Sequence, residues 1–202
     1  LSGIVLDLRN NPGGLLNEAI RVSDAFLEEG EIVSTRGRDD SDIQHAYARA
    51  GDITRGLPIV ILINSGSASA SEIFAGAIQD YQRGIIVGEQ SYGKGTVQSV
   101  LDLSRFVRSE KENPGVLKIT LEKFYRITGS STQHKGVSPD FALPSAFSAE
   151  EFGESSQPSA LPWDMIPSTT YQPTNHVLAP ALAKLQAAFA TRLKTKPDLI
   201  KL

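Results

Sequence analysis

Two features of this sequence carry residue types that could do chemistry: a serine-rich turn and a lysine between two glycines. Three serines, Ser67, Ser69 and Ser71, alternate with alanines directly before a run with helical periodicity. Lys94 follows about 25 positions after the central serine. A helix N-terminus presents free backbone N–H groups and the positive end of the helix dipole, which stabilise an oxyanion developing beside a serine. The arrangement therefore indicates nucleophilic catalysis, although each serine could serve only as a helix cap.

A serine hydroxyl needs a base, and the sequence offers few candidates. No G-x-S-x-G motif is present, and His45, His134 and His176 belong to no recognised catalytic or metal-binding motif. Lys94 remains, because burial in an apolar pocket favours the neutral amine, which can accept the serine proton. Gln98 could orient that amine if the chain bends between the two residues. Activity that rises toward alkaline pH is expected from such a base.

The same lysine also allows a different hypothesis. Residues 88–95 fit the pattern G-x-x-x-x-G-K and follow a predicted strand, as a phosphate-binding P-loop does. However, Gly95 stands where the Mg²⁺-binding Ser or Thr should follow the lysine, and residues 96–103 alternate like a strand instead of opening a helix. Nucleotide binding is therefore the weaker alternative.

Predicted strands and helices alternate along the first half of the chain. Short apolar runs rich in β-branched residues predict strands, and apolar residues spaced three and four apart predict helices. Strands separated by helices imply a largely parallel α/β core, which two later apolar runs extend to about residue 144. The predicted strands are 4–8, 57–63, 85–88, 97–101, 116–121 and 123–127, and the predicted helices are 15–27 and 72–81.

The composition describes a globular protein and excludes several functions. The chain has 202 residues, of which 40% are hydrophobic and 21% charged, and its net charge is −3. Because no basic run is present, neither nucleic acid nor an anionic membrane is expected as a partner. No apolar run approaches the roughly 18 residues of a membrane span. The absence of cysteine removes a thiol nucleophile and thiolate metal sites, and we expect no metal or other cofactor.

Two polar regions are assigned no chemistry. Residues 36–56 contain Asp39, Asp40 and Asp42, where a paired-carboxylate site is conceivable, but we interpret this region as a solvated loop. Residues 145–176 are rich in Ser, Pro and Glu, which cannot bury enough apolar surface to form a core. We interpret that region as a linker or a wrapping arm.

An amphipathic helix is predicted near the C-terminus. Its apolar residues are Leu178, Leu182, Leu185 and Phe189, at spacings of three and four. Such a helix needs a surface on which to pack. The predicted organisation is therefore a catalytic core at 1–144, the linker or arm at 145–176 and the start of a helical extension at 177–202.

Four segments in this order and spacing resemble the C-terminal processing peptidases. They are 3–14 (GIVLDLRNNPGG), 67–73 (SASASEI), 87–98 (VGEQSYGKGTVQ) and 134–140 (HKGVSPD). Within that family, EKFYR at 122–126 and LPWD at 161–164 are most similar to the bacterial tail-specific members. The resemblance covers roughly residues 3–165.

This resemblance implies a fold and an activity. The family comprises serine endopeptidases that cut proteins near apolar C-termini, and its fold is a crotonase-like or ClpP-like α/β core with ββα units, here followed by a C-terminal helical segment. By motif position, Ser69 corresponds to the nucleophile, Lys94 to the general base and Gln98 to the residue that orients the base. The implied partners are unfolded or C-terminally exposed protein substrates, in the periplasm or cell envelope of a bacterium.

The resemblance also assigns supporting residues. The implied oxyanion donors are the Ala70 N–H and one N–H of the Gly13-Gly14 turn, with the choice between the two glycines open. Glu72 and Asp80 match acidic positions of the family and are expected to give structural support.

Two departures from the family pattern stand out. Ser91 stands where a threonine is usual, so the hydroxyl is kept. The family's PDZ domain, which captures substrate C-termini, precedes the Asp-Leu-Arg strand and is not in this sequence. Because the sequence starts at Leu1, we expect it to be part of a longer protein. The alternative hypothesis is a catalytically incompetent fragment that acts as a peptide-binding module.

Overall fold

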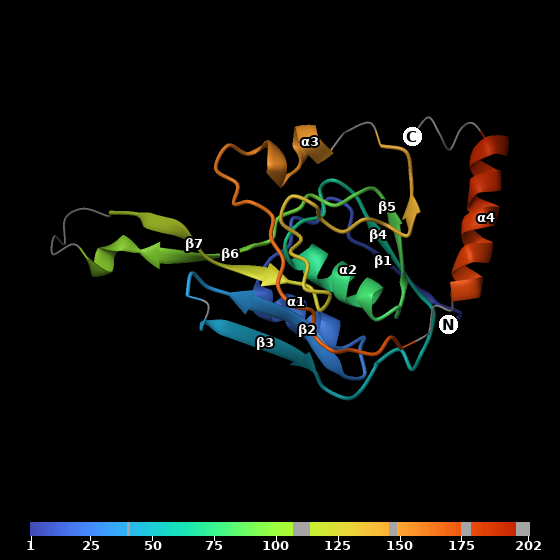
Figure 1. Ribbon diagram of the computed structural model, residues 1–202, viewed down its shortest axis with the longest axis horizontal. Coiled ribbons are helices and arrows are strands. Elements are labelled where there is room, and N and C mark those ends of the chain that lie inside the picture. The colour runs from blue at the N-terminus through green and yellow to red at the C-terminus, as the bar shows by residue number, and fades with distance from the viewer. Residues whose placement is uncertain (40, 107–113, 146–148, 175–178, 197–202) are drawn as a thin grey trace.

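Two four-stranded sheets and the helices between them form the body of the protein. The computed structural model describes residues 1–202 apart from 40, 107–113, 146–148, 175–178 and 197–202 (Figure 1). The elements are β1 Ile4–Asp7, α1 Leu16–Asp24, β2 Gly30–Arg36, β3 Ile43–Ala48, β4 Ile59–Ile63, α2 Ala70–Asp80, β5 Ile85–Gly88, β6 Thr96–Asp102, η1 Leu103–Arg105, β7 Val116–Tyr125, β8 Phe141–Ala142, α3 Ala149–Phe152, η2 Glu154–Ser156 and α4 Ala179–Thr195.

The first sheet is parallel, as the alternation of strands and helices predicts. Its strand order is β1-β4-β5-β8, and each neighbouring pair runs in the same direction. The isoleucines at 59, 61 and 63 alternate along β4 and are buried on the face toward α2. β-Branched side chains suit such a strand, because they pack well on a pleated surface.

α2 is the centre of the hydrophobic core. It lies between the sheets and contacts β5 of the first and β2 of the second. Eight of its residues are buried, among them Phe74, whose ring meets the edge of Phe26 at 5.5 Å between centroids. At the other end, the Tyr81 hydroxyl donates a hydrogen bond to the Glu31 carbonyl of β2. The helix that carries the serine turn is therefore fixed on two sides.

The second sheet is antiparallel and was not predicted as such. Its order is β3-β2-β7-β6. The expected loop at 36–56 contains β3, and β2 precedes it; both were missed because β3 is a largely exposed strand and β2 buries polar residues such as Glu31, Ser34 and Thr35. The two strands expected between 116 and 127 form the single strand β7, because the chain continues without a turn.

The aspartate cluster of the expected loop forms a turn. Asp39 accepts hydrogen bonds from the backbone amide and the hydroxyl of Ser41, and these bonds lower the pKa of its carboxyl below the ordinary value. Asp42 is exposed, and Asp40 lies outside the described residues. This turn is a surface feature, as a solvated loop would be.

The chain after the two sheets lies along the core. The Trp163 indole donates to the Ser131 carbonyl, and the Thr169 amide donates to the Ile127 carbonyl. α4 then stands against the outer face of the parallel sheet (Figure 1), where Phe189 contacts Phe141 edge-on at 5.6 Å between ring centroids. Leu178, expected to begin this helix, lies outside the described residues.

Candidate active site

The three serines of the turn before α2 have different environments. The Ser67 hydroxyl donates to the Leu8 carbonyl at 2.8 Å, and the Ser71 hydroxyl donates to the Asn11 carbonyl at 3.0 Å. Both bonds tie the turn to the loop after β1, so these two side chains hold the turn in place. The Ser69 hydroxyl donates to no residue that the structure describes. Of the three, it alone is available as a nucleophile.

The backbone at Ser69 is strained. Its φ of 56° and ψ of −112° lie where L-residues with a side chain are rare. Such strain persists only where neighbouring contacts enforce it, and it is concentrated at functional sites. Here the Ser69 amide donates to the Glu72 carboxylate at 2.7 Å, and the Ala68 amide donates to the Asn11 carbonyl at 3.0 Å. The turn therefore presents Ser69 in a fixed conformation at the start of α2.

The Gly13-Gly14 turn approaches this serine closely. A Cβ placed on Gly13 would lie 2.7 Å from the Ala70 nitrogen and 3.0 Å from the Ser69 Cβ, and φ there is +91°. A side chain is therefore excluded at Gly13 on two grounds. The Gly13 amide already donates to the Asn11 side-chain oxygen at 3.0 Å. The amides of Gly14 and Ala70 donate to no described residue, so both are available to a ligand.

The loop that carries Lys94 is packed against residues 131–134. A Cβ on Gly93 would meet the His134 carbonyl carbon at 2.8 Å, and a Cβ on Gly95 would meet the Gln133 nitrogen at 2.6 Å. The Gly95 amide donates to the Gln133 side-chain oxygen, and the His134 amide donates to the Gly93 carbonyl, both at 2.8 Å. The glycines on either side of Lys94 thus permit close packing that a side chain at either position would prevent.

Glu72 connects the serine turn to the lysine loop. Its carboxylate, which is fully buried, accepts hydrogen bonds from the Ser69 amide at 2.7 Å, the Gly93 amide at 2.7 Å and the Lys94 amide at 2.9 Å. The Ser91 hydroxyl donates the fourth, at 2.6 Å. Burial raises the pKa of Glu72 to about 7, because desolvation penalises the charged form, and the four hydrogen bonds oppose that rise. One side chain therefore sets the relative position of both loops.

Ser91 extends this connection to a third motif. Besides donating to Glu72, its hydroxyl accepts a hydrogen bond from the Val137 amide at 2.7 Å. Val137 lies in the segment 134–140, which is one of the four segments that resemble the C-terminal processing peptidases and which has no role assigned from sequence. The structure shows that this segment supports the lysine loop. Sequence reasoning missed the role of Ser91, and the hydroxyl kept in place of the usual threonine was the available signal.

Ser69 and Lys94 line the same cavity, which has a volume of about 250 Å³. Gly14, Ala70 and Gln98 also line it. Lys94 is partly buried and forms no ion pair with any carboxylate among the described residues. No hydrogen bond joins the serine hydroxyl to the lysine amine, and the side-chain nitrogen of Gln98 points to the Thr120 hydroxyl at 3.4 Å. The cavity thus brings together the predicted nucleophile, base and orienting residue without hydrogen bonds between them.

A second cavity of about 250 Å³ is lined by the Gly13-Gly14 turn. Gly14, Leu15 and Ala70 line both cavities, so the second one adjoins the Ser69 site. Its remaining lining is mostly apolar and comes from β1, α1 and α2 and the loops beside them, through Leu6, Leu8, Val22, Phe26 and Phe74. An apolar side chain would fit such a cavity.

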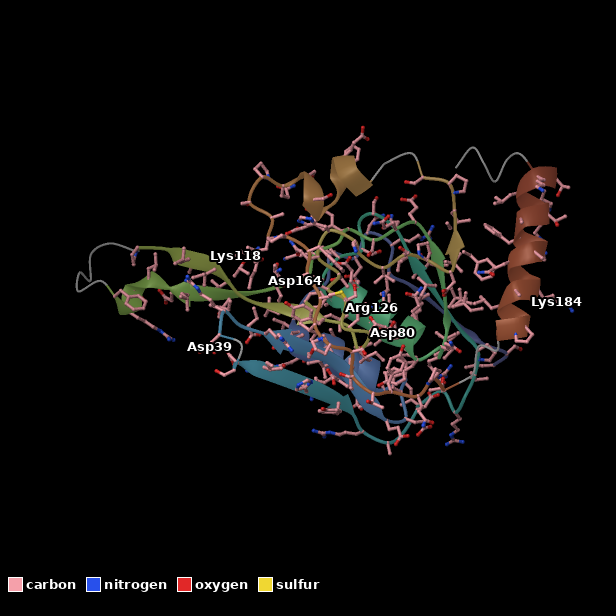
Figure 2. All side chains as sticks on the ribbon, in the orientation of Figure 1. Asp39, Asp80, Lys118, Arg126, Asp164 and Lys184 are labelled. Carbon is pink, nitrogen blue, oxygen red and sulfur yellow. The ribbon has the colours of Figure 1, made fainter. Side chains whose placement is uncertain are left out.

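Asp80 lies at the opposite end of α2, away from these cavities. Its carboxylate accepts two hydrogen bonds from the Arg126 guanidinium, at 2.9 and 2.5 Å (Figure 2). Burial raises the pKa of Asp80 above its ordinary value, and Arg126 opposes that shift. The pair joins the end of α2 to the residue that follows β7.

Other functions find no support in this geometry. A P-loop requires a helix after its lysine, but the strand β6 follows Lys94, so the nucleotide-binding hypothesis is wrong. Among the described residues, no cluster of three or more metal-ligating side chains occurs. His45 contacts Glu31 at 3.0 Å, His134 belongs to the support of the lysine loop, and His176 lies outside the described residues. No helix in the described part is both long and apolar enough to cross a membrane.

Comparison with family models identifies the class of this chain. Residues 1–143 match the model of peptidase family S41, and residues 147–202 match the model of the C-terminal domain of tail specific protease. The chain therefore belongs to peptidase family S41, whose solved members share its α/β fold with one parallel and one antiparallel sheet.

Individual relatives support this assignment. A carboxy-terminal-processing protease of Bartonella bacilliformis is 52% identical over 143 residues, which are 71% of this chain and 31% of that protein. A tail-specific protease of Haemophilus influenzae is 39% identical over 201 residues, 98% of this chain and 29% of that protein. The solved photosystem II D1 C-terminal processing protease superposes with a TM-score of 0.61 at 36% identity, covering 71% of this chain and 35% of that one. This chain thus spans about a third or less of the length of each.

Proposed function

We propose that this chain carries the active site of a serine endopeptidase that uses a Ser–Lys dyad. The nucleophile is Ser69 and the general base is Lys94. The observation that carries the proposal is their shared cavity, in which Ser69 is held in a strained turn and the lysine has no carboxylate partner among the described residues. A neutral lysine amine can act as the base for a serine hydroxyl, and no described carboxylate competes for this one.

The reaction follows acyl-transfer chemistry. The neutral Lys94 amine takes the proton of the Ser69 hydroxyl while the serine oxygen attacks the peptide carbonyl carbon. Collapse of the tetrahedral intermediate breaks the C–N bond, and the lysine gives its proton to the leaving amine. Water, deprotonated by the same amine, then attacks the ester and frees the serine and the new carboxylate. We assign Gln98 to orienting the amine once substrate fills the cavity.

Two backbone amides form the proposed oxyanion hole. Ala70 supplies one, as the first residue of α2, where helix amides have no partner within the helix and the dipole is positive. Gly14 supplies the other, because the Gly13 amide is already engaged by the Asn11 side chain. Gly13 instead allows the close approach of the two turns. Two such donors supply much of the transition-state stabilisation in acyl transfer.

The proposed substrates are unfolded or C-terminally exposed proteins cut near apolar C-termini. The apolar cavity that adjoins the oxyanion turn supports this preference, since it would accept an apolar side chain beside the scissile bond. We propose the periplasm or cell envelope of a bacterium as the site of action, which the family resemblance and the bacterial relatives support. We also propose a crotonase-like or ClpP-like core at 1–144, a wrapping arm at 145–176 and a helical extension from 177.

Replacement of single serines tests this function. Ser69→Ala is expected to abolish cleavage of an unfolded protein such as casein, whereas Ser71→Ala, which removes only the bond to Asn11, is expected to retain measurable activity. Cleavage is followed by electrophoresis and by mass spectrometry of the new termini. Cleavage by Ser69→Ala at the wild-type rate would refute the nucleophile. A wild-type protein that binds casein but cuts nothing would support the peptide-binding module instead.

A further inference from the structure

The outer edge of β6 has no strand beside it. β6 is the last strand of its sheet, and no described strand pairs with its far side. The Leu103 amide donates to the carbonyl of Gly115, the residue opposite it on the other strand. In an antiparallel ladder, pairs that exchange hydrogen bonds alternate with pairs that do not. Gln98 and Val100 belong to pairs of the second kind, so their amides point away from β7. Their N–H and C=O groups therefore face outward as a free row.

This edge lacks the features that protect exposed strands from pairing. Exposed edges are commonly blocked by lysine, proline or a bulge that distorts the strand. The sequence TVQSVLD has no lysine, arginine or proline. The irregularity in its pairing places the extra residue, Leu121, on β7, so that β6 stays continuous. The strand thus keeps the geometry needed to accept another one.

The free edge is continuous with the Ser69 cavity. Thr96, Val97 and Gln98 of β6 line that cavity, and the strand then runs outward along the arm that projects from the body in Figure 1. Farther out, the side chain of Val100 is 62% exposed and that of Leu101 is 38% exposed. A chain that pairs with β6 would therefore contact apolar side chains on the arm and enter the cavity at its base.

We propose that the outer edge of β6, Thr96–Asp102, is a docking strand that binds an extended segment of the substrate polypeptide by strand addition and leads it to Ser69. This inference rests on the proposed function. Strand addition takes its affinity from main-chain hydrogen bonds, so it accepts many sequences, provided that the segment is unfolded. The occupant is a polypeptide because only a main chain offers donors and acceptors at the strand repeat.

Two proline substitutions on the arm form a matched test. Val100→Pro removes an outward N–H from the β6 edge, and proline is tolerated at such edge positions. Val116→Pro is the control, because Val116 is 65% exposed and its pairing with Asp102 directs its amide toward the opposite edge of the arm. Both variants keep the β6–β7 ladder bonds. Thermal unfolding by circular dichroism verifies that each is folded.

The readouts are casein cleavage and labelling of Ser69 by a small fluorophosphonate, which needs no docking strand. We expect Val100→Pro to raise KM for casein at least tenfold while labelling proceeds at the wild-type rate, and Val116→Pro to cleave as wild type does. Equal effects of the two prolines, or no effect of either, would overturn the docking strand. Absence of labelling in the wild type would instead overturn the proposed function.

Self-association through the same edge is distinguished by sedimentation velocity. The docking strand predicts that Val100→Pro leaves the sedimentation coefficient of the wild type unchanged. A shift toward a smaller species, with unchanged casein cleavage, would show that β6 pairs with a second copy of the chain and would overturn the proposal.

Discussion

α2 is anchored by a buried acid near each end, and the two acids have different partners. Near the N-terminal end, Glu72 accepts four hydrogen bonds from neutral donors, three of them backbone amides. At the C-terminal end, Asp80 accepts two bonds from Arg126 (Figure 2). An ion pair suffices to hold a helix on a strand. Glu72 instead joins two loops through their backbone amides, and it does so without a second cation near Lys94 among its hydrogen-bond partners.

The largest expected loss of activity is at Glu72. Glu72→Ala leaves the amides of Ser69, Gly93 and Lys94 without an acceptor, so the serine turn and the lysine loop lose their common anchor. Because a misplacement of about 1 Å can cost roughly 100-fold in rate, we expect kcat/KM for casein to fall by about that factor or more. Activity within about threefold of wild type would show that the anchor does not position the dyad.

The anchor at Asp80 is expected to act on stability. Asp80→Ala leaves the Arg126 guanidinium, which is mostly buried, without its partner, and breaking such a pair costs about 3 kcal/mol. Urea unfolding measures this loss for Asp80→Ala, for Arg126→Ala and for the double variant. The double variant should be less destabilised than the sum of the single ones. Additive losses would show that the two side chains do not interact.

The complete burial of Glu72 predicts a pH effect on stability, because desolvation raises the pKa of its carboxyl. Its pKa is about 7 in the folded state and 4.5 in the unfolded reference, so between these values the folded state binds the extra proton. Stability should therefore fall as pH rises through that interval, by at most about 3 kcal/mol. Urea unfolding at pH 5 and pH 7.5, compared with Glu72→Gln, isolates this residue. An equal pH dependence in the two proteins would contradict the assignment.

The smallest effect concerns the hydroxyl that links Glu72 to Val137. Ser91→Ala removes both of its hydrogen bonds and is expected to cost about 1–2 kcal/mol of folding stability, with a modest loss of activity. Ser91→Thr keeps the hydroxyl and should lie closer to wild type in both. Thermal unfolding and casein cleavage compare the two. Threonine as damaging as alanine would show that packing volume, not the hydroxyl, matters at this position.

The parallel half of the fold could be predicted from sequence, whereas the antiparallel half largely could not. The apolar run at 57–63 and the apolar residues after it identify β4 and α2, because β4 buries one face and most of α2 is buried in the same core. β3 has mostly exposed side chains, and β2 places Glu31, Ser34 and Thr35 inside, where tertiary partners satisfy them. Strand prediction from hydrophobic periodicity relies on apolar residues, so it does not detect a strand whose polar side chains become buried when it pairs with its neighbours in the sheet.

Within the site, residue types could be predicted but their bonds could not. The small-residue turn indicates a serine nucleophile and the flanking glycines draw attention to Lys94, but the choice of Ser69 among the three serines comes from the family resemblance. The choice of Gly14 over Gly13 as oxyanion donor depends on one bond from the Asn11 side chain. The role of Glu72 depends on amides about 20 positions away in the chain. Such bonds form only when the loops meet, so no local pattern records them.

Labelling of the serine by a fluorophosphonate, with the adduct mapped by mass spectrometry, tests the Ser–Lys dyad most directly. The account predicts an adduct on Ser69 alone, a labelling rate that rises with pH, and loss of labelling in Lys94→Ala. An adduct on a different serine, or labelling of Lys94→Ala at the wild-type rate and pH dependence, would contradict it.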